Sequence, residues 1–147
     1  MRLVPAGPAA FALALALALP ARAPAADYGS GVSVKVVLKT TVTASGEKFR
    51  YPVTDRAEVT ASEVEIAPGA DTGLHRHPGP VLAWVVSGTL SVDVAGGETK
   101  TYTAGQPIVE VVGLDHVGKN RGTVPVRLLV FYLGAEGAPL TVKEGSP

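Results

Sequence analysis

The sequence predicts an all-β fold, a barrel or sandwich of about ten short strands. Glycine and proline occur 17 and 12 times among the 147 residues, so the chain reverses direction often. Turn residues separate the candidate strands roughly every 8–12 residues, and no helical periodicity extends beyond one or two turns. Because 46% of the residues are hydrophobic, a chain of this length can bury the core of a single domain.

The strands are expected where apolar residues alternate or run together between turn residues. The segment 81–86, VLAWVV, is apolar throughout, as a strand buried on both faces would be. Four glycines, Gly69, Gly88, Gly105 and Gly113, are expected to adopt positive φ at chain reversals. The expected strands are 32–43, 47–53, 58–66, 81–86, 89–94, 98–103, 107–112, 113–116, 126–133 and 140–143.

The first 26 residues are expected to be a secretory signal peptide outside the fold. Arg2 supplies a positive start, residues 9–19 form an unbroken run of Ala, Leu and Phe, and small residues at 21–25 offer cleavage sites. With 11 residues, the apolar run is too short for a membrane-spanning helix, which needs about 20. The mature domain, residues 27–147, is therefore expected to be periplasmic or secreted, without a stable membrane anchor. An uncleaved leader is the alternative.

Composition excludes several classes of function. Acidic and basic side chains balance at 13 each, so the chain has no net charge that would attract nucleic acid. Cysteine is absent, which rules out disulfides, zinc–thiolate sites, iron–sulfur clusters and cysteine nucleophiles. The sequence also lacks the motifs of serine nucleophiles and phosphate-binding loops, so it gives no support to a hydrolase or a kinase.

The three histidines of the chain, His75, His77 and His116, predict a metal site. Side chains at i and i+2 of a strand point to the same face, which puts the Cα atoms of His75 and His77 about 6.5 Å apart. Two imidazoles at that spacing can bind one metal ion at about 2.0–2.1 Å each. A barrel interior can bring His116, on a later strand, to the same ion.

Two stretches around these histidines resemble the paired motifs of the cupin family. The first stretch is Gly69-(x5)-His75-x-His77-(x3)-Val81-(x6)-Gly88. The second stretch is Gly105-(x5)-Val111-x-Gly113-(x2)-His116-(x3)-Asn120. The resemblance implies a small exported single-domain cupin, in which residues 27–147 form one double-stranded β-helix, or jelly-roll barrel, with its core at about 58–133. It also implies one divalent transition metal at the centre of the barrel, held by His75, His77 and His116.

The chain departs from these motifs at Val81, where the usual residue is Glu, and at Val111, where it is usually Pro. Val81 cannot bind a metal, so the one anionic ligand of the usual site is absent. Three neutral imidazoles around a dication leave a site near +2, which favours an anionic substrate or co-ligand. This set resembles the three-histidine iron sites of some cupin dioxygenases.

Glu110 is the candidate catalytic residue and a candidate substitute ligand, because it precedes His116 by six residues in the second motif. If its strand directs it inward, it coordinates the metal or holds a metal-bound water. If its strand directs it outward, it is an acid at the barrel rim that pairs with Lys or Arg. Asp115 has the opposite strand parity to His116 and is expected outside the barrel.

The resemblance leaves three functions open, because cupins host many activities. The first is a metal-dependent, oxygenase-like enzyme that acts on a small anionic organic molecule. The second is a periplasmic barrel that binds a small ligand or a metal without catalysis, and the third is a catalytically idle cupin with a structural role. Imidazole ligands suit Zn, Cu, Fe and Ni, with Mn less favoured. The β-branched segment 32–42 is expected to mediate a homodimer.

Overall fold

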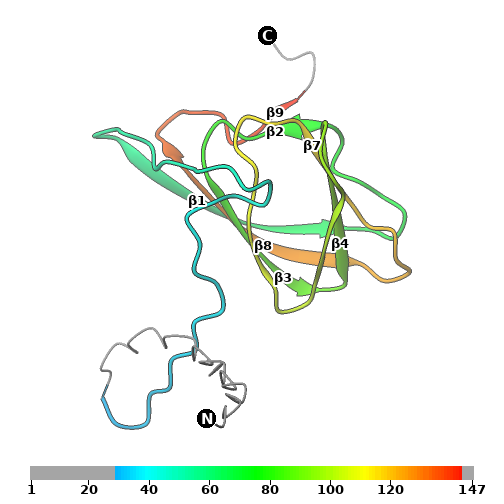
Figure 1. The fold of residues 1–147 in the computed structure, drawn as a ribbon, viewed down its shortest axis with the longest axis horizontal. Helices are drawn as coiled ribbons and strands as arrows, with labels where there is room; N and C mark the ends of the chain where they lie inside the picture. Colours follow the sequence, from blue (N-terminus) through cyan, green and yellow to red (C-terminus); the bar gives the residue numbers. More distant parts are fainter. Residues whose placement is uncertain (1–28, 144–147) are drawn as a thin grey trace, which may run out of the picture. The chain divides into compact units, whose positions relative to one another are not determined.

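The computed structural model describes residues 29–143, and all regular structure in that range is β-strand (Figure 1). The predicted signal peptide lies outside the described residues. The chain divides into two units, residues 1–35 and 36–147, and the second contains all nine described strands. Within the described range, no helix could span a membrane. The strands are β1 (Ala57–Ile66), β2 (His75–Arg76), β3 (Val81–Ser87), β4 (Thr89–Val94), β5 (Lys100–Thr103), β6 (Pro107–Val109), β7 (His116–Lys119), β8 (Val126–Ala135) and β9 (Val142–Lys143).

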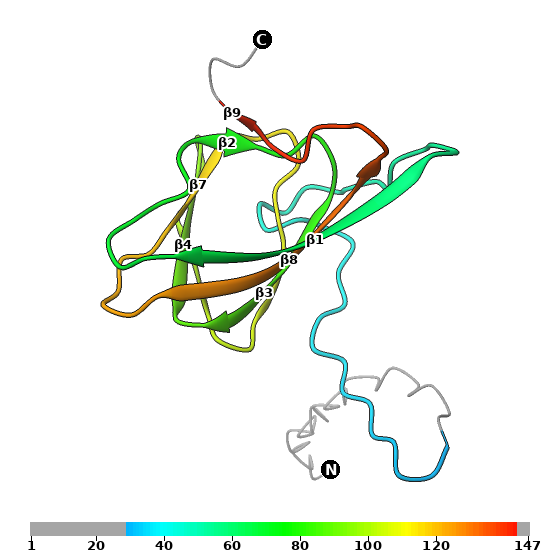
Figure 2. The ribbon, with the colours of Figure 1, turned by 180° about the vertical axis from the view of Figure 1, so that it is seen from behind.

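The strands form two antiparallel sheets that wrap around a shared interior (Figures 1 and 2). One sheet has the order β1-β8-β3-β6, and the other has the order β5-β4-β7-β2-β9. Neighbours come from distant parts of the chain, since β8 pairs with β1 on one side and with β3 on the other. This arrangement is a jelly-roll β-barrel, which confirms the predicted fold class.

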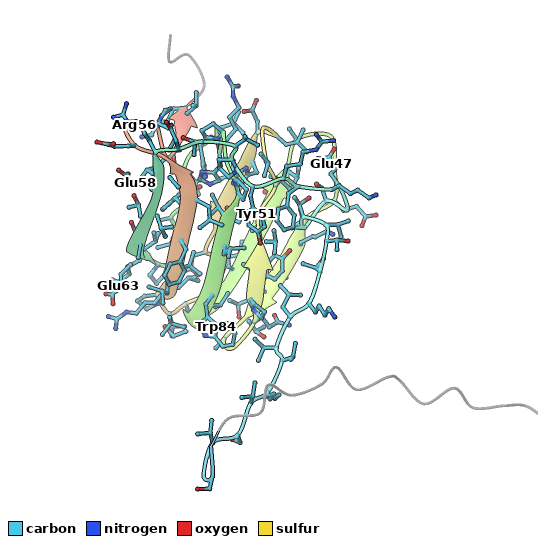
Figure 3. All side chains as sticks on the ribbon, turned by 90° about the vertical axis from the view of Figure 1, so that its left-hand side faces the viewer. Glu47, Tyr51, Arg56, Glu58, Glu63 and Trp84 are labelled. Carbon is cyan, nitrogen blue, oxygen red and sulfur yellow. The ribbon has the colours of Figure 1, made fainter. Side chains whose placement is uncertain are left out.

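The core lies between the sheets because strand alternation directs every second side chain inward. In β1, Val64 and Ile66 face the core, whereas Glu63 and Glu65 are exposed. Figure 3 shows Glu63 and Glu58 at the outer edge of this sheet. Burying one large apolar side chain stabilises the fold by about 1.5–3 kcal/mol. The buried apolar residues are Ile66, Val81, Ala83, Val85, Leu90, Ile108, Val126, Leu128 and Val130.

Two predicted strands are absent. Segments 32–43 and 47–53 contain only an isolated bridge between Val42 and Lys48. The β-branched residues favour extended backbone, but a strand also needs a neighbour for its backbone hydrogen bonds, and residues 33–41 pair with no strand of the described chain. The homodimer expected through segment 32–42 stays a prediction.

The expectation that segment 81–86 is buried on both faces is wrong. In β3, Val81, Ala83 and Val85 are buried, whereas Val86 is 54% exposed. Trp84, labelled in Figure 3, is only partly covered. The reason is that β3 belongs to an antiparallel sheet that packs only one of its faces against the core.

The glycines expected to adopt positive φ all do so. Their φ angles are 74° at Gly69, 80° at Gly88, 84° at Gly105 and 71° at Gly113. Gly88, which joins β3 to β4, meets a second constraint: a Cβ atom placed there would lie 2.7 Å from the carbonyl oxygen of Pro125. The close approach of these two backbone segments therefore requires glycine.

We expect Gly88→Ala to lower the free energy of unfolding by about 3 kcal/mol, because its methyl group meets backbone that cannot move aside. Gly96→Ala is the matched control, since Gly96 has a φ of 70° and nothing within 4 Å of its added Cβ. The control should lose only about 1 kcal/mol, from the left-handed conformation alone. Urea denaturation measures both variants, and equal losses would contradict the steric role of Gly88.

Candidate metal centre

Three buried histidines meet inside the barrel. His75 opens β2, His77 follows that strand, and His116 opens β7 rather than ending a strand as expected. His75 lies directly opposite His116 in the antiparallel pairing of β2 with β7. The three residues are 8%, 3% and 2% exposed, and their candidate ligand atoms all lie within 4.8 Å of one another. The fold thus brings together the three residues that the sequence singled out.

Each imidazole is oriented by a backbone carbonyl group. The acceptors are the oxygens of Gly73, Leu140 and Leu114, which lie 2.8, 2.9 and 3.0 Å from Nδ1 of His75, His77 and His116, respectively. A carbonyl oxygen can only accept, so Nδ1–H is the donor in every pair. In a neutral ring, the other nitrogen, Nε2, then has a free lone pair. All three histidines are therefore fixed in the tautomer that binds a metal through Nε2.

A carboxylate lies against this cluster. Glu110 Oε2 is 3.3 Å from Nε2 of His77 and 3.3 Å from Nε2 of His116, and the Glu110 side chain is only 16% exposed. Of the two orientations that the sequence left open, the chain adopts the inward one. Asp115 lies on the outside, as expected, with its carboxylate 3.5 Å from Arg76.

The register between β3 and β6 explains why Glu110 points inward. Val109, the last residue of β6, pairs with Leu82, and the next residue, Glu110, donates its N–H to the Val81 oxygen at 2.9 Å. Glu110 therefore lies opposite Val81, and opposed residues in an antiparallel pair share a face. Since Val81 is buried, Glu110 is directed into the same interior. A carboxylate thus enters the interior from the residue opposite Val81.

The cluster brings the lone pairs of two imidazoles and a carboxylate close together. Nε2 of His116 is buried and has no hydrogen-bond partner among the described residues. Burial raises the pKa of Glu110, but its contacts with His116 and His77 outweigh burial and lower the pKa to about 2, so the carboxylate is ionised at neutral pH. An anionic oxygen facing two imidazole lone pairs needs a proton or a cation between them. Three imidazoles and one carboxylate fit a divalent transition metal.

The pKa values of His75 and His116 are shifted in opposite directions. Burial lowers the pKa of His75, which favours the neutral ring. Burial also acts to lower the pKa of His116, but the contact with Glu110 acts in the opposite direction and leaves that pKa raised. The raised pKa of His116 means that a proton competes with a metal for this ring.

A cavity of about 180 Å³ opens beside the histidines. Its volume lies below the range of about 300–1,000 Å³ that is typical of sites for drug-sized ligands, so it suits a small molecule. No Lys or Arg of the described chain lines it. Besides the imidazoles and Glu110, the polar lining consists of Thr72, Tyr132 and Thr141. The aliphatic lining consists of Val64, Ile66, Leu90, Val92, Leu128 and Val130.

Sequence reasoning missed the groups that orient the histidines. Gly73 and Leu114 precede His75 and His116, respectively, by two residues. A hydrogen bond from Nδ1 to the carbonyl oxygen two residues earlier could therefore have been considered from the sequence. Sequence reasoning did not identify Thr72 either. Its hydroxyl accepts a hydrogen bond from the N–H of Gly118 at 3.0 Å, which fastens the loop before His75 to β7. The Leu140 carbonyl comes from the end of the chain, and no local pattern indicates it.

The C-terminal segment, residues 140–143, contacts β2, which contains His75, and also His77, which follows that strand. β9 pairs with β2 through His75 opposite Lys143 and Arg76 opposite Val142. The other neighbour of β2 is β7, with one residue pair. Leu140 also accepts the Nδ1–H of His77, and the Thr141 hydroxyl lies 3.4 Å from the same nitrogen. The segment therefore fixes both the strand and one imidazole.

A chain that ends at Ala138 is expected to bind Zn(II) about 10–100-fold more weakly than a chain that ends at Lys143, because His77 loses its acceptor and β2 loses a neighbour. Competition with a chromophoric chelator measures both dissociation constants. The chain ending at Lys143 is the control, since it keeps every described contact of the segment. Equal affinities would show that the segment does not support the site.

Comparison with known proteins agrees with the motif resemblance. The model of the cupin domain family matches residues 62–132. The beta-alanine degradation protein BauB of Pseudomonas aeruginosa is 38% identical over 64 residues, which cover 42% of this chain and 67% of that protein. The residues matched by the family model include His75, His77 and His116.

Two solved structures have a similar fold. A structure of oxalate oxidase superposes with a TM-score of 0.50 and 26% identity, over 58% of this chain and 46% of that chain. A cupin-like protein from Thermotoga maritima superposes with a TM-score of 0.52 and 19% identity, over 60% of this chain and 65% of that chain. The chain therefore matches less than half the length of the oxalate oxidase chain, and the second likeness concerns the fold alone.

Proposed function

Because this chain belongs to the cupin superfamily, we propose that it is an exported, metal-dependent, oxygenase-like enzyme that acts on a small anionic organic molecule. The observation that carries the proposal is the convergence of three imidazoles and the Glu110 carboxylate in a buried cluster beside a cavity. The similarity to an oxalate oxidase supports chemistry on a small anion. The similarity to a beta-alanine degradation protein supports a role in the metabolism of a small molecule.

We infer that His75, His77 and His116 hold one divalent transition metal and that Glu110 replaces the anionic ligand absent at Val81. The donor set suits Fe, Zn, Cu, Ni or Mn, and the carboxylate improves the match to Mn and Fe. When bound, such an ion supplies a Lewis acid and, if redox-active, a centre for electron transfer. One carboxylate lowers the charge of the site from +2 to about +1, which still attracts an anion.

The chain's own residues support proton handling and the exclusion of water. Glu110 is the only carboxylate among the described residues that line the cavity, so proton transfer to or from a bound molecule falls to it. Burial, together with the charge of Glu110, raises the pKa of Tyr132, so its phenol stays protonated at neutral pH and can donate to an anionic oxygen. The aliphatic lining keeps the cavity dry, which strengthens these polar interactions.

Export to the periplasm or the medium is supported by the leader in residues 1–26 and fits the absence of cysteine, which makes the fold independent of redox conditions. A protein folded in that compartment takes up the metal that is available there. The metal is therefore best identified on protein recovered from that compartment.

Protein recovered from the native compartment is expected to begin near Ala26 and to contain about one transition-metal ion per chain. His75→Ala and His116→Ala should lose the metal, because each removes one of three imidazoles. Arg76→Ala is the control, since Arg76 lies between two of the histidines and pairs outward with Asp115. Mass spectrometry and elemental analysis provide the readouts. A metal-free wild type whose melting temperature is unchanged by a chelator would sink the proposal.

Glu110→Gln tests the second half of the proposal, because it keeps the shape of the side chain and removes its charge. With Fe(II) bound, wild-type protein is expected to consume oxygen in the presence of a small carboxylic acid, and the variant to do so about 10²–10⁴-fold more slowly at matched metal content. Glu63→Gln on the outer face of β1 is the control. If the Glu110→Gln variant consumes oxygen at the wild-type rate, or binds the metal with wild-type affinity, Glu110 does not have the proposed role.

A further inference from the structure

The lining of the cavity beside the histidines combines two kinds of side chain, polar and aliphatic. Its polar groups gather at the imidazoles, since the hydroxyl of Thr72 lies 3.3 Å from Nδ1 of His75 and that of Thr141 lies 3.4 Å from Nδ1 of His77. The Tyr132 ring centroid is 5.6 Å from that of His77. The rest of the lining is aliphatic and comes from β1, β4 and β8. A molecule bound here has its polar end at the histidines and the remainder against hydrocarbon.

The aliphatic part of the lining has no partner for a second charge. Among the residues that the structure describes, no Lys or Arg lines the cavity, and Glu110 would repel a second carboxylate. Moving an unpaired carboxylate from water to a hydrocarbon surface costs several kcal/mol, far more than the cavity could return through packing. Dicarboxylates are therefore disfavoured, in contrast to molecules with one charged end and one aliphatic end.

The volume of the cavity determines how much of a bound molecule it can cover. A cavity of about 180 Å³ holds about six groups of the size of water, at about 30 Å³ each. A carboxylate or a similar chelating head occupies about two of these places. The remaining space accommodates about three to four carbon atoms.

We propose that the substrate is a short aliphatic monoanion, with one head group that binds the metal and a hydrocarbon chain of about three to four carbons in contact with Val64, Ile66 and Leu128. The inference rests on the proposed metal site and adds the substrate class to it. The negative charge of such a substrate would be balanced by the metal at the histidines. Its hydrocarbon chain would contact side chains that belong to the barrel core or pack against it.

Protein loaded with Co(II) tests this inference, because the visible spectrum of the ion reports on an added ligand. Titrations would use straight-chain monocarboxylates from acetate to octanoate. Affinity is expected to rise about fourfold for each methylene group, up to butyrate or valerate, and then to fall when the chain exceeds the cavity. Succinate and glutarate should bind at least about tenfold more weakly than butyrate and valerate. A flat series, or succinate bound as tightly as butyrate, would overturn the inference.

A matched pair of variants locates the hydrocarbon chain. Val64→Thr keeps the shape of a residue that lines the cavity and adds a hydroxyl, so butyrate affinity should fall about fivefold while acetate affinity stays unchanged. Val59→Thr makes the same change on an exposed position of β1 and should leave both affinities unchanged. Equal effects of the two variants on butyrate would also count against the inference.

The same titration separates the two levels of the proposal. Protein that takes up no Co(II) overturns the metal site and the substrate class together. Protein that binds Co(II) through the histidines, with Co(II) lost in His116→Ala, but shows no dependence on chain length overturns the substrate class alone.

Discussion

The antiparallel pairing of β2 with β7 is the contact on which the site depends. It consists of one residue pair, His75 opposite His116, and it joins two histidines that belong to different motifs. A shift of this register by one residue would turn one imidazole to the opposite face of the sheet. Two other contacts support the register of β2 against β7. One is the hydrogen bond from the N–H of Gly118 to the Thr72 hydroxyl, and the other is the pairing of β2 with β9. The long ladders of the opposite sheet, above all β1 with β8, supply the stable framework against which this short pairing is positioned.

Much of the fold could be predicted because strand signals are local. Alternating or apolar runs bounded by glycine identified the positions of β1, β3, β4, β5 and β8, and positive φ at Gly88 followed from its place in a tight turn. The same signals failed for segment 32–43, because β-branched composition predicts an extended chain and cannot supply the neighbour that makes it a strand. The prediction that β3 is buried on both faces was wrong for a related reason. Composition alone does not reveal whether a second layer covers the outer face of the sheet.

The same distinction applies to the candidate site: its local features could be predicted, and those that depend on strand pairing could not. The histidine cluster could be predicted, because side chains two residues apart in an extended segment point to the same side, although only His75 belongs to β2. The orientation of Glu110 could not be, because it follows from the register of β3 against β6, which no single segment contains. The carbonyl of Leu140 was equally hidden, since its partner His77 lies 63 residues earlier in the chain. The position of Glu110 opposite Val81 directs its carboxylate to the interior that Val81 also faces.

The backbone origin of the three bonds that orient the imidazoles has a consequence for how this barrel can diversify. Side-chain substitutions cannot delete the carbonyl oxygens of Gly73, Leu114 and Leu140, so the tautomers of the histidines are insulated from most point mutations. The walls of the cavity, by contrast, consist of ordinary aliphatic side chains on strands, which exchange for one another at low cost in stability. Substitutions in the cavity wall can therefore change which small molecules fit, while the orientation of the imidazole donor atoms stays the same. The backbone acceptors that orient the histidines are thus less sensitive to substitution than the side chains that shape the cavity.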